Sequence, residues 1–151
     1  MSPVQVWERG LNSMVDGMNN AASTGFGLVF FIVGVQHFTN AAWFEPIVPD
    51  VLGNPTFWVW LTGVMEIGLG LGLMVRRYRR RAALLTAAFL VGVYWANLNM
   101  WINNVAIGGQ TYGHAWHVGR LIAQLGMIGF CLLIAGALDE EPVRWNDPHN
   151  A

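Results

Sequence analysis

Apolar residues form four long runs along the chain, separated by short polar, proline-containing or glycine-containing segments. The runs cover about residues 21–38, 56–75, 82–106 and 114–138. A helix rises ~1.5 Å per residue, so each run is long enough to cross a hydrocarbon core of ~30 Å. The pattern therefore predicts an all-α fold, an integral membrane four-helix bundle that forms a single domain over residues 1–151.

The N-terminal segment has a different pattern, because its apolar side chains recur at spacings of three and four residues. Polar side chains occupy the opposite side, as is typical of an amphipathic helix. We therefore expect an interfacial helix over about residues 3–18, lying on the membrane surface. Its apolar face consists of Val4, Trp7, Leu11, Met14 and Met18. The acidic segment 139–151 is expected to be a cytoplasmic, loosely ordered tail.

Composition supports the membrane assignment. Hydrophobic residues make up 54% of the chain and charged residues only 11%, too few charges to cover a water-soluble domain. The formal net charge of −1 argues against nucleic acid as a partner, since phosphate binding needs a spread basic surface. Membrane lipid is the expected environment.

The basic residues, which are all arginine, are concentrated in residues 76–81, between the second and third runs. The two other loops contain none. Short loops rich in arginine stay on the cytoplasmic side, so this loop is predicted to be cytoplasmic. With four spans, both termini are then cytoplasmic as well, in the cell inner (cytoplasmic) membrane.

Several ionisable and amide side chains interrupt the apolar runs, although burying the worst of them in a span costs ~2.5–3.5 kcal/mol. In the predicted topology these side chains lie between the middle of the membrane and its outer surface. We expect them to line a polar, ligand-binding pocket that opens toward the outer leaflet. The expected ligand-binding residues are His37, Glu66, Asn97, His117 and Arg120.

Arg120 is expected to pair with Glu66, because an arginine below the membrane surface needs a counter-charge. Three interpretations of Glu66 remain open. The carboxylate can belong to an ion pair that holds the helices together, it can contact a ligand or a proton, or it can be protonated and unpaired.

His114 and His117 lie on one helical face at positions i and i+3, a spacing that can bind a metal ion or haem. A full set of ligands is not evident, so neither metal nor haem is expected as a cofactor. His37 can supply a third ligand across the bundle, or it can hydrogen-bond a loop carbonyl.

A set of short segments carries a family resemblance. These are GVQHF at 34–38, IVP at 47–49, Trp58, TGVMEIG at 62–68, RAA at 81–83 and ANLNM at 96–100. Together they resemble the DoxX family of small membrane proteins over about residues 25–104. The chain departs from that family at Leu52-Gly53, where Leu-Pro is common, and the fourth helix lies outside the resemblance.

The resemblance implies a four-helix membrane fold and an association with quinone-linked redox systems. We therefore expect an integral membrane subunit or accessory protein of a quinone-linked redox complex, with quinone as the cofactor. It would act with membrane protein partners or as a homo-oligomer, and not as a catalyst on its own. The alternative is an assembly factor or structural scaffold whose buried polar groups only determine helix packing. A small-solute transporter is less favoured, because neither an inverted repeat nor a broken helix is apparent.

Overall fold

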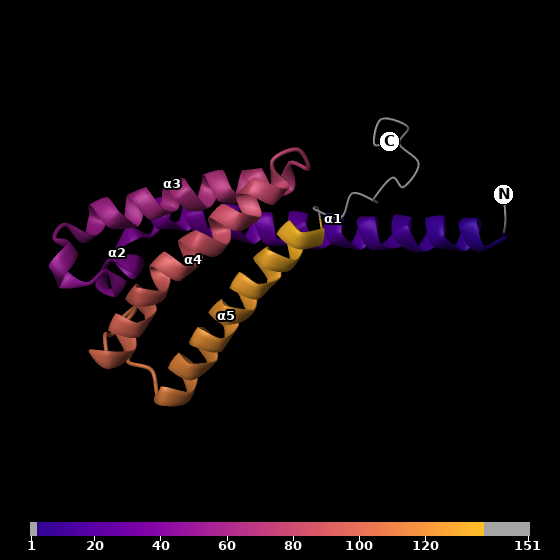
Figure 1. Ribbon diagram of the computed structural model, residues 1–151. Helices are drawn as coiled ribbons and strands as arrows, with labels where there is room; N and C mark the ends of the chain where they lie inside the picture. Colours follow the sequence, from indigo (N-terminus) through magenta and orange to yellow (C-terminus); the bar gives the residue numbers. More distant parts are fainter. Residues whose placement is uncertain (1–2, 138–151) are drawn as a thin grey trace, which may run out of the picture.

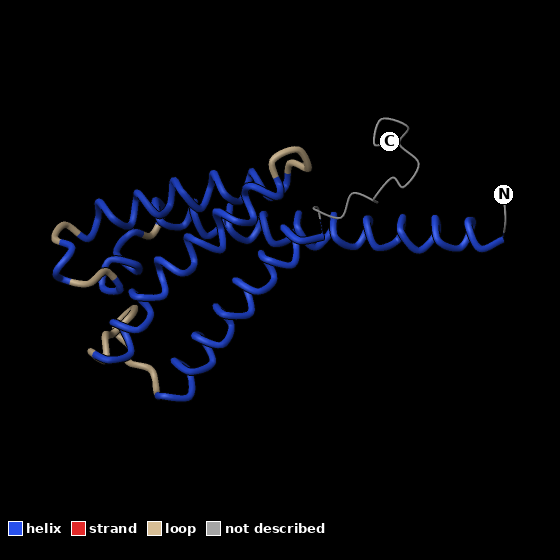
Figure 2. Tube along the Cα trace, viewed as in Figure 1, coloured by secondary structure: helices blue, strands red, loops and turns tan. Residues whose placement is uncertain are grey.

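The computed structural model describes residues 3–137, which form helices joined by short loops and contain no β-strand (Figures 1 and 2). In chain order the elements are α1 (Pro3–Thr39), α2 (Ala41–Phe44), η1 (Glu45–Ile47), η2 (Asp50–Leu52), α3 (Pro55–Met74), α4 (Arg79–Ile102) and α5 (His114–Ala137). The helices α1, α3, α4 and α5 are long and apolar enough to cross a membrane. The tail expected over residues 139–151 lies outside the described residues.

Helix α1 is continuous, so the expected interfacial helix and the expected first span form one helix rather than two. Polar residues at the junction do not interrupt it, because hydroxyl groups bond back to the preceding turn. The hydroxyl of Ser23 donates to the carbonyl of Asn19 at 2.6 Å, and that of Thr24 to the carbonyl of Asn20 at 2.8 Å. The N-terminal half of α1 extends beyond the other helices (Figure 1), and its apolar face is exposed. Its position on a membrane surface remains a prediction.

The boundaries of α3 and α4 have local causes. At the start of α3, Asn54 accepts a hydrogen bond from the backbone N–H of Phe57, and Pro55 occupies the first turn. At its end, the buried Arg79 donates from Nε to the carbonyl of Leu73 at 2.9 Å. Helix α4 therefore begins within the arginine cluster. It ends at Ile102, whereas the sequence predicted an end near residue 106. The helix cannot continue through Asn104, because this residue adopts a left-handed φ of 47°.

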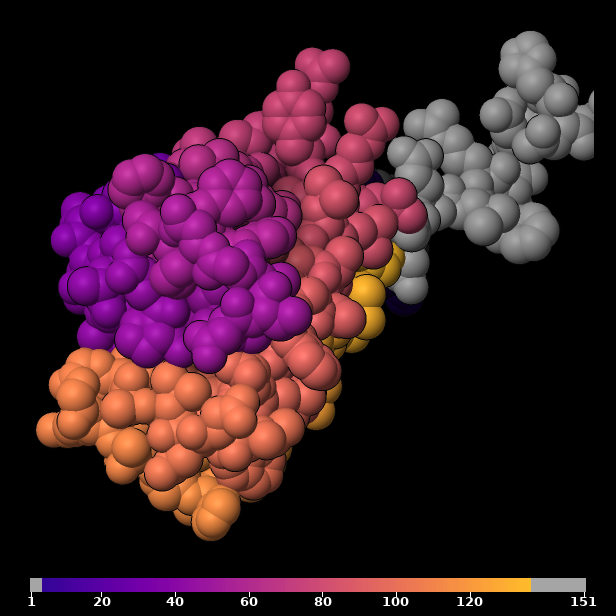
Figure 3. Space-filling model, turned by 90° about the vertical axis from the view of Figure 1, so that its left-hand side faces the viewer, coloured from indigo at the N-terminus to yellow at the C-terminus, as the bar shows by residue number. Residues whose placement is uncertain are grey.

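The four long helices pack mainly as two pairs, α1 with α3 and α4 with α5. Figure 1 shows the pairs close together near the α3–α4 turn, residues 75–78, and diverging toward the other end. At that loop end, Figure 3 shows the segment that contains α2 and the segment between α4 and α5 as two adjoining blocks.

The buried apolar core joins the two pairs on the side of the α3–α4 turn. It contains Phe30, Leu73, Ala82, Ala83, Ala87, Phe89, Leu90, Cys131, Ile134 and Ala135. Aromatic contacts link the elements, since Phe26 of α1 packs edge-on against Phe130 of α5, with ring centroids 5.3 Å apart.

Candidate functional site

His37 and Glu66 lie side by side where α1 crosses α3. The Nδ1 atom of His37 is 3.3 Å from Oε2 of Glu66. The same Nδ1 lies 2.9 Å from the carbonyl oxygen of Val33, to which it donates. Oε2 of Glu66 is buried and has no hydrogen-bond partner among the residues that the structure describes. The carboxyl group therefore keeps an unused hydrogen-bonding position next to the imidazole.

Gly63 makes the contact between these two helices possible. A Cβ atom at this position would lie 2.7 Å from Cβ of His37 and 2.9 Å from the ring of Phe38. The imidazole of His37 also stacks on the ring of Phe44 in α2, with centroids 4.0 Å apart and planes 20° apart. The position of His37 is thus determined from two sides, by α3 and by α2.

Gln124 connects α5 to α4. The side-chain amide of Asn97 donates to Oε1 of Gln124, and Nε2 of Gln124 donates to the carbonyl of Leu90 at 2.8 Å. Gln124 is only 2% exposed, and its hydrogen bond to Leu90 is buried, whereas the one from Asn97 is partly buried. Asn97 is therefore held by a partner within the protein.

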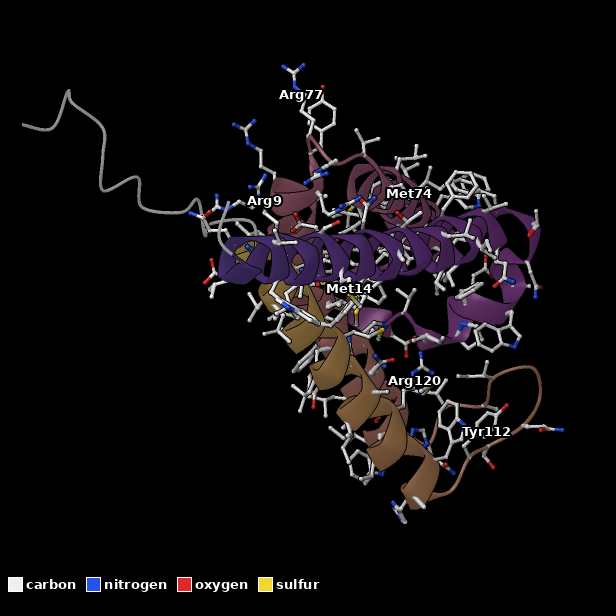
Figure 4. The ribbon with its side chains drawn as sticks, turned by 90° about the vertical axis from the view of Figure 1, so that its right-hand side faces the viewer. Arg9, Met14, Met74, Arg77, Tyr112 and Arg120 are labelled. Atoms are coloured by element: carbon white, nitrogen blue, oxygen red, sulfur yellow. The ribbon has the colours of Figure 1, made fainter. Side chains whose placement is uncertain are left out.

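Arg120 does not pair with Glu66, and that sequence-based prediction is wrong. Its Nη1 lies 3.7 Å from the sulfur of Met100, and its guanidinium carbon lies 5.3 Å from the ring centroid of Trp116. Among residues 3–137, the ion-pair contact of Glu66 is the one with His37. The reason is the helix pairing, because α1 and not α5 packs on the Glu66 face of α3. Figure 4 shows Arg120 extending from the α4–α5 pair toward the α1–α3 pair.

The two histidines of α5 lie in an aromatic cluster. His117 stacks on Trp101, with centroids 6.0 Å and planes 6° apart, and is 3% exposed. Its Nδ1 has no hydrogen-bond partner in the described part of the chain. His114 accepts a hydrogen bond at Nδ1 from Nε1 of Trp101, at 2.9 Å. The cluster continues with Tyr112, labelled in Figure 4, which stacks on Trp116. Within residues 3–137, no three histidine, cysteine, aspartate or glutamate side chains are grouped to hold a metal ion.

A cavity of about 1450 Å³ lies between the helices, and we call it the central cavity. Its polar wall comes from all four long helices and consists of His37, Thr62, Glu66, Asn97, Arg120 and Gln124. Toward the α3–α4 turn the wall is mainly apolar, with Leu69, Leu71, Gly72, Val75, Leu85, Ala88 and Phe89, and Tyr78 and Arg81 line it at the turn itself. Four of the five side chains expected to bind a ligand thus face one space, whereas His117 is not on its wall.

Gln124 and Thr62 belong to the polar wall but were not among the expected ligand-binding residues. The sequence contains a signal for Gln124, because it lies one helical turn beyond Arg120 on the polar face of α5. Thr62 lies one turn from Glu66, but its hydroxyl bonds to the carbonyl of Trp58 at 2.9 Å, as threonines in any apolar helix do. Helical periodicity alone does not distinguish a threonine that lines a cavity from one that only bonds to its own helix.

Four apolar helices indicate a multi-pass membrane protein, all-helical over its described residues and hollowed by a cavity with a partly polar wall. Residues 26–135 match the family described as a domain of unknown function (DUF8561), and the chain belongs to that family. The matched region includes every residue that lines the central cavity. None of the curated proteins and none of the solved structures compared with the chain matches it.

Proposed function

We propose that this protein is a membrane subunit or accessory protein of a quinone-linked redox complex and binds a quinone in the central cavity. The observation that carries the proposal is the composition of the cavity wall. Hydrogen-bonding side chains from all four long helices face a space whose remaining wall is mainly apolar. Ligand sites are commonly built in this way, with a few convergent polar groups in an apolar pocket.

The chemistry of a quinone suits these groups. Its two carbonyl oxygens accept hydrogen bonds, which the guanidinium of Arg120 is able to donate from the wall. When the ring is reduced, its hydroxyl groups become donors, and Oε2 of Glu66 offers a buried acceptor without a partner. His37, 3.3 Å from that oxygen, completes a pair of groups able to exchange a proton with the ligand.

The resemblance of residues 25–104 to the DoxX family supports the same proposal. We place the protein in the cell inner membrane as a bundle, with the arginine-rich turn and both termini on the cytoplasmic side. The polar wall then lies in the outer half of the membrane, and the N-terminal half of α1 lies on the cytoplasmic side. Partner proteins of the complex, or further copies of the chain, would supply the remaining redox centres.

A specific observation favours the alternative of a structural scaffold. Asn97 and Gln124 bond to each other and to Leu90, and His117 packs between two tryptophans, so these polar groups already serve helix packing. A scaffold would lose stability when they are replaced and would bind no quinone. The two functions therefore predict different results, since a quinone-binding protein loses quinone affinity and a scaffold loses stability when these residues are replaced.

The test is a quinone titration of the purified protein in nanodiscs prepared without quinone. Trp58 and Trp95 line the cavity, so binding should quench tryptophan fluorescence. The substitution Arg120→Met should weaken binding about 10–100-fold, because a hydrogen bond from a charged donor contributes ~1.5–3 kcal/mol. The matched control is Arg77→Gln in the exposed α3–α4 turn, which should bind like the wild type. Absence of saturable quenching in the wild type would reject the proposal and leave the scaffold.

A further inference from the structure

On the side between α3 and α4, exposed side chains of both helices line the central cavity, and we call this side its opening. The two helices touch near their shared turn, where a Cβ atom at Gly72 would lie 2.8 Å from Cβ of Ala82. From there they diverge toward the loop end (Figure 1). At the loop end the cavity wall includes Ile47, Pro49 and Leu52, so the space between the two helices is bounded at both ends.

Most residues at this opening are apolar and exposed, although they also line the cavity, and the exposed Arg81 borders it at the turn. On α4, Leu85 is 61% exposed and Trp95 is 63% exposed. On the α3 side, Met65, Leu71 and Val75 are likewise both exposed and part of the wall. If α3 and α4 span a bilayer, an apolar opening between them faces the acyl chains and not water. A molecule dissolved in the membrane would therefore enter sideways.

The size of the cavity indicates what kind of molecule would fill it. Its volume of about 1450 Å³ exceeds the ~300–1,000 Å³ of sites that enclose a drug-sized ligand. The polar wall occupies only part of it, and a mainly apolar wall continues along α3 and α4 to the turn, where Val75 is joined by Tyr78 and the charged Arg81. A ring-sized head group would leave this apolar part empty, whereas a head group with a long apolar tail would fill it.

We infer that the ligand of the central cavity carries a long apolar tail, enters from the bilayer through the opening between α3 and α4, and lays its tail along the apolar wall near Gly68 and Gly92. The head group would meet the polar wall at His37, Glu66 and Arg120. The inference rests on the proposed function for the quinone head group. The lateral path and the tail requirement follow from the opening and the volume.

Two glycines allow the path to be blocked from opposite sides without disturbing the fold. Gly68 of α3 and Gly92 of α4 both line the cavity, and a Cβ atom at either would meet no atom within 4 Å. The substitutions Gly68→Leu and Gly92→Leu therefore fill the opening with side chain and also raise helix propensity. Gly119→Leu and Gly126→Leu are the matched controls, because these glycines of α5 are equally unobstructed but lie off the cavity wall.

The experiment compares a tailless benzoquinone with the same head group carrying a long isoprenoid tail, in nanodiscs. The wild type should bind the long-tailed quinone at least about tenfold more tightly relative to its partition into empty nanodiscs. Gly68→Leu and Gly92→Leu should weaken binding of the long-tailed quinone about tenfold or more. The two control variants should bind it like the wild type. The melting temperatures of all four variants should be unchanged or higher. Equal binding of both quinones, or unchanged binding in the two cavity variants, would overturn the inference and leave the quinone proposal standing.

A second readout is independent of the head group. Mass spectrometry of the protein released from mild detergent should show a co-purified, tail-bearing lipid in the wild type and in Gly119→Leu, and should show its loss in Gly68→Leu. If neither quinone binds but this pattern is seen, the proposed function fails and the inference holds. If no tail-bearing molecule is retained and neither quinone binds, both fail.

Discussion

Gln124 links two helices through one buried side chain. Its amide bonds both to Asn97 and to the backbone carbonyl of Leu90, in a region where few other groups can replace those partners. Interhelical hydrogen bonds within membranes contribute ~0.6 kcal/mol on average and up to ~1.7 kcal/mol each. The two hydrogen bonds together should make a measurable contribution of Gln124 to the free energy of unfolding.

Replacing Gln124 by leucine should therefore lower the free energy of unfolding by ~1–3 kcal/mol, since it removes two hydrogen bonds between α5 and α4. Reversible unfolding in mixed detergent micelles measures the change. Asn103→Ala is the control, because Asn103 donates to Asn99 in an exposed hydrogen bond of 2.8 Å and should matter little. Equal losses in the two variants would show that burial does not determine the effect.

Replacing Glu66, unlike replacing Gln124, should not lower the free energy of unfolding. The buried oxygen Oε2 of Glu66 has no hydrogen-bond partner in the described residues, so a charge on this group would carry a burial cost without a strong compensating bond. Glu66→Gln preserves size and removes the charge, and the variant should unfold no more easily than the wild type while binding quinone less well. A melting temperature lowered as far as that of Gln124→Leu would assign the carboxylate a structural role instead.

The partner of Glu66 could not be predicted from charge alone. Charge complementarity suggested Arg120, and the membrane setting made a counter-charge plausible. Which residues meet depends on which helix faces pack, and Arg120 has Trp116 and Met100 as neighbours instead. A cation–π contact satisfies a guanidinium without any acidic residue, so its need for a carboxylate could not be assumed.

Among the helices, the closest approach is the crossing of α1 and α3, which is built from two pairs of glycines. A Cβ atom at Gly27 would lie 2.6 Å from the carbonyl oxygen of Gly70, and one at Gly34 would lie 2.8 Å from that of Gly63. Small residues of this kind allow backbones of membrane helices to pack directly. In the sequence, Gly63 and Gly70 are seven residues apart and fall on one face of a helix, but this spacing does not say which helix occupies that face.

The substitution Gly34→Ala or Gly70→Ala should destabilise the protein by ~1–3 kcal/mol, the usual cost of overpacking, because the obstructing atoms are backbone atoms. Thermal unfolding in detergent measures this. Gly25 lies on α1, as Gly34 does, but no atom lies within 4 Å of an added Cβ, so Gly25→Ala should be neutral or stabilising by ~0.5–1 kcal/mol. Equal effects at positions 25 and 34 would contradict the tight crossing.

For the whole molecule, the four apolar runs predicted the number and type of the long helices, because their lengths match a membrane span. They did not predict the two-pair packing. In helices that are apolar on all sides, no hydrophobic face points to the neighbour, and packing depends on the shapes of small residues. The continuity of α1 was missed for a different reason, since hydroxyl side chains at the junction bond to the helix backbone instead of capping an end.

Topology is the prediction that belongs to this scale. A cysteine introduced at Val51, which is 85% exposed, should react with an impermeant maleimide from outside the cell. One introduced at Arg77 should react only after the cytoplasm is opened. The native Cys131 is fully buried and should stay silent, so no cysteine-free background is needed. Reaction of both positions from the same side would reject the four-span arrangement.

The glycine crossing also has a consequence for how this family can vary. Gly27 and Gly34 are seven residues apart on α1, as Gly63 and Gly70 are on α3. The two helices run antiparallel, so Gly27 faces Gly70 and Gly34 faces Gly63. Inserting or deleting one residue within either interval would rotate the following side chains by ~100° and remove a glycine from the crossing. It would also move His37 away from Glu66. Changes in chain length during evolution should therefore accumulate before residue 27, in 40–54 and in 103–113, and be excluded from 27–37 and 63–70.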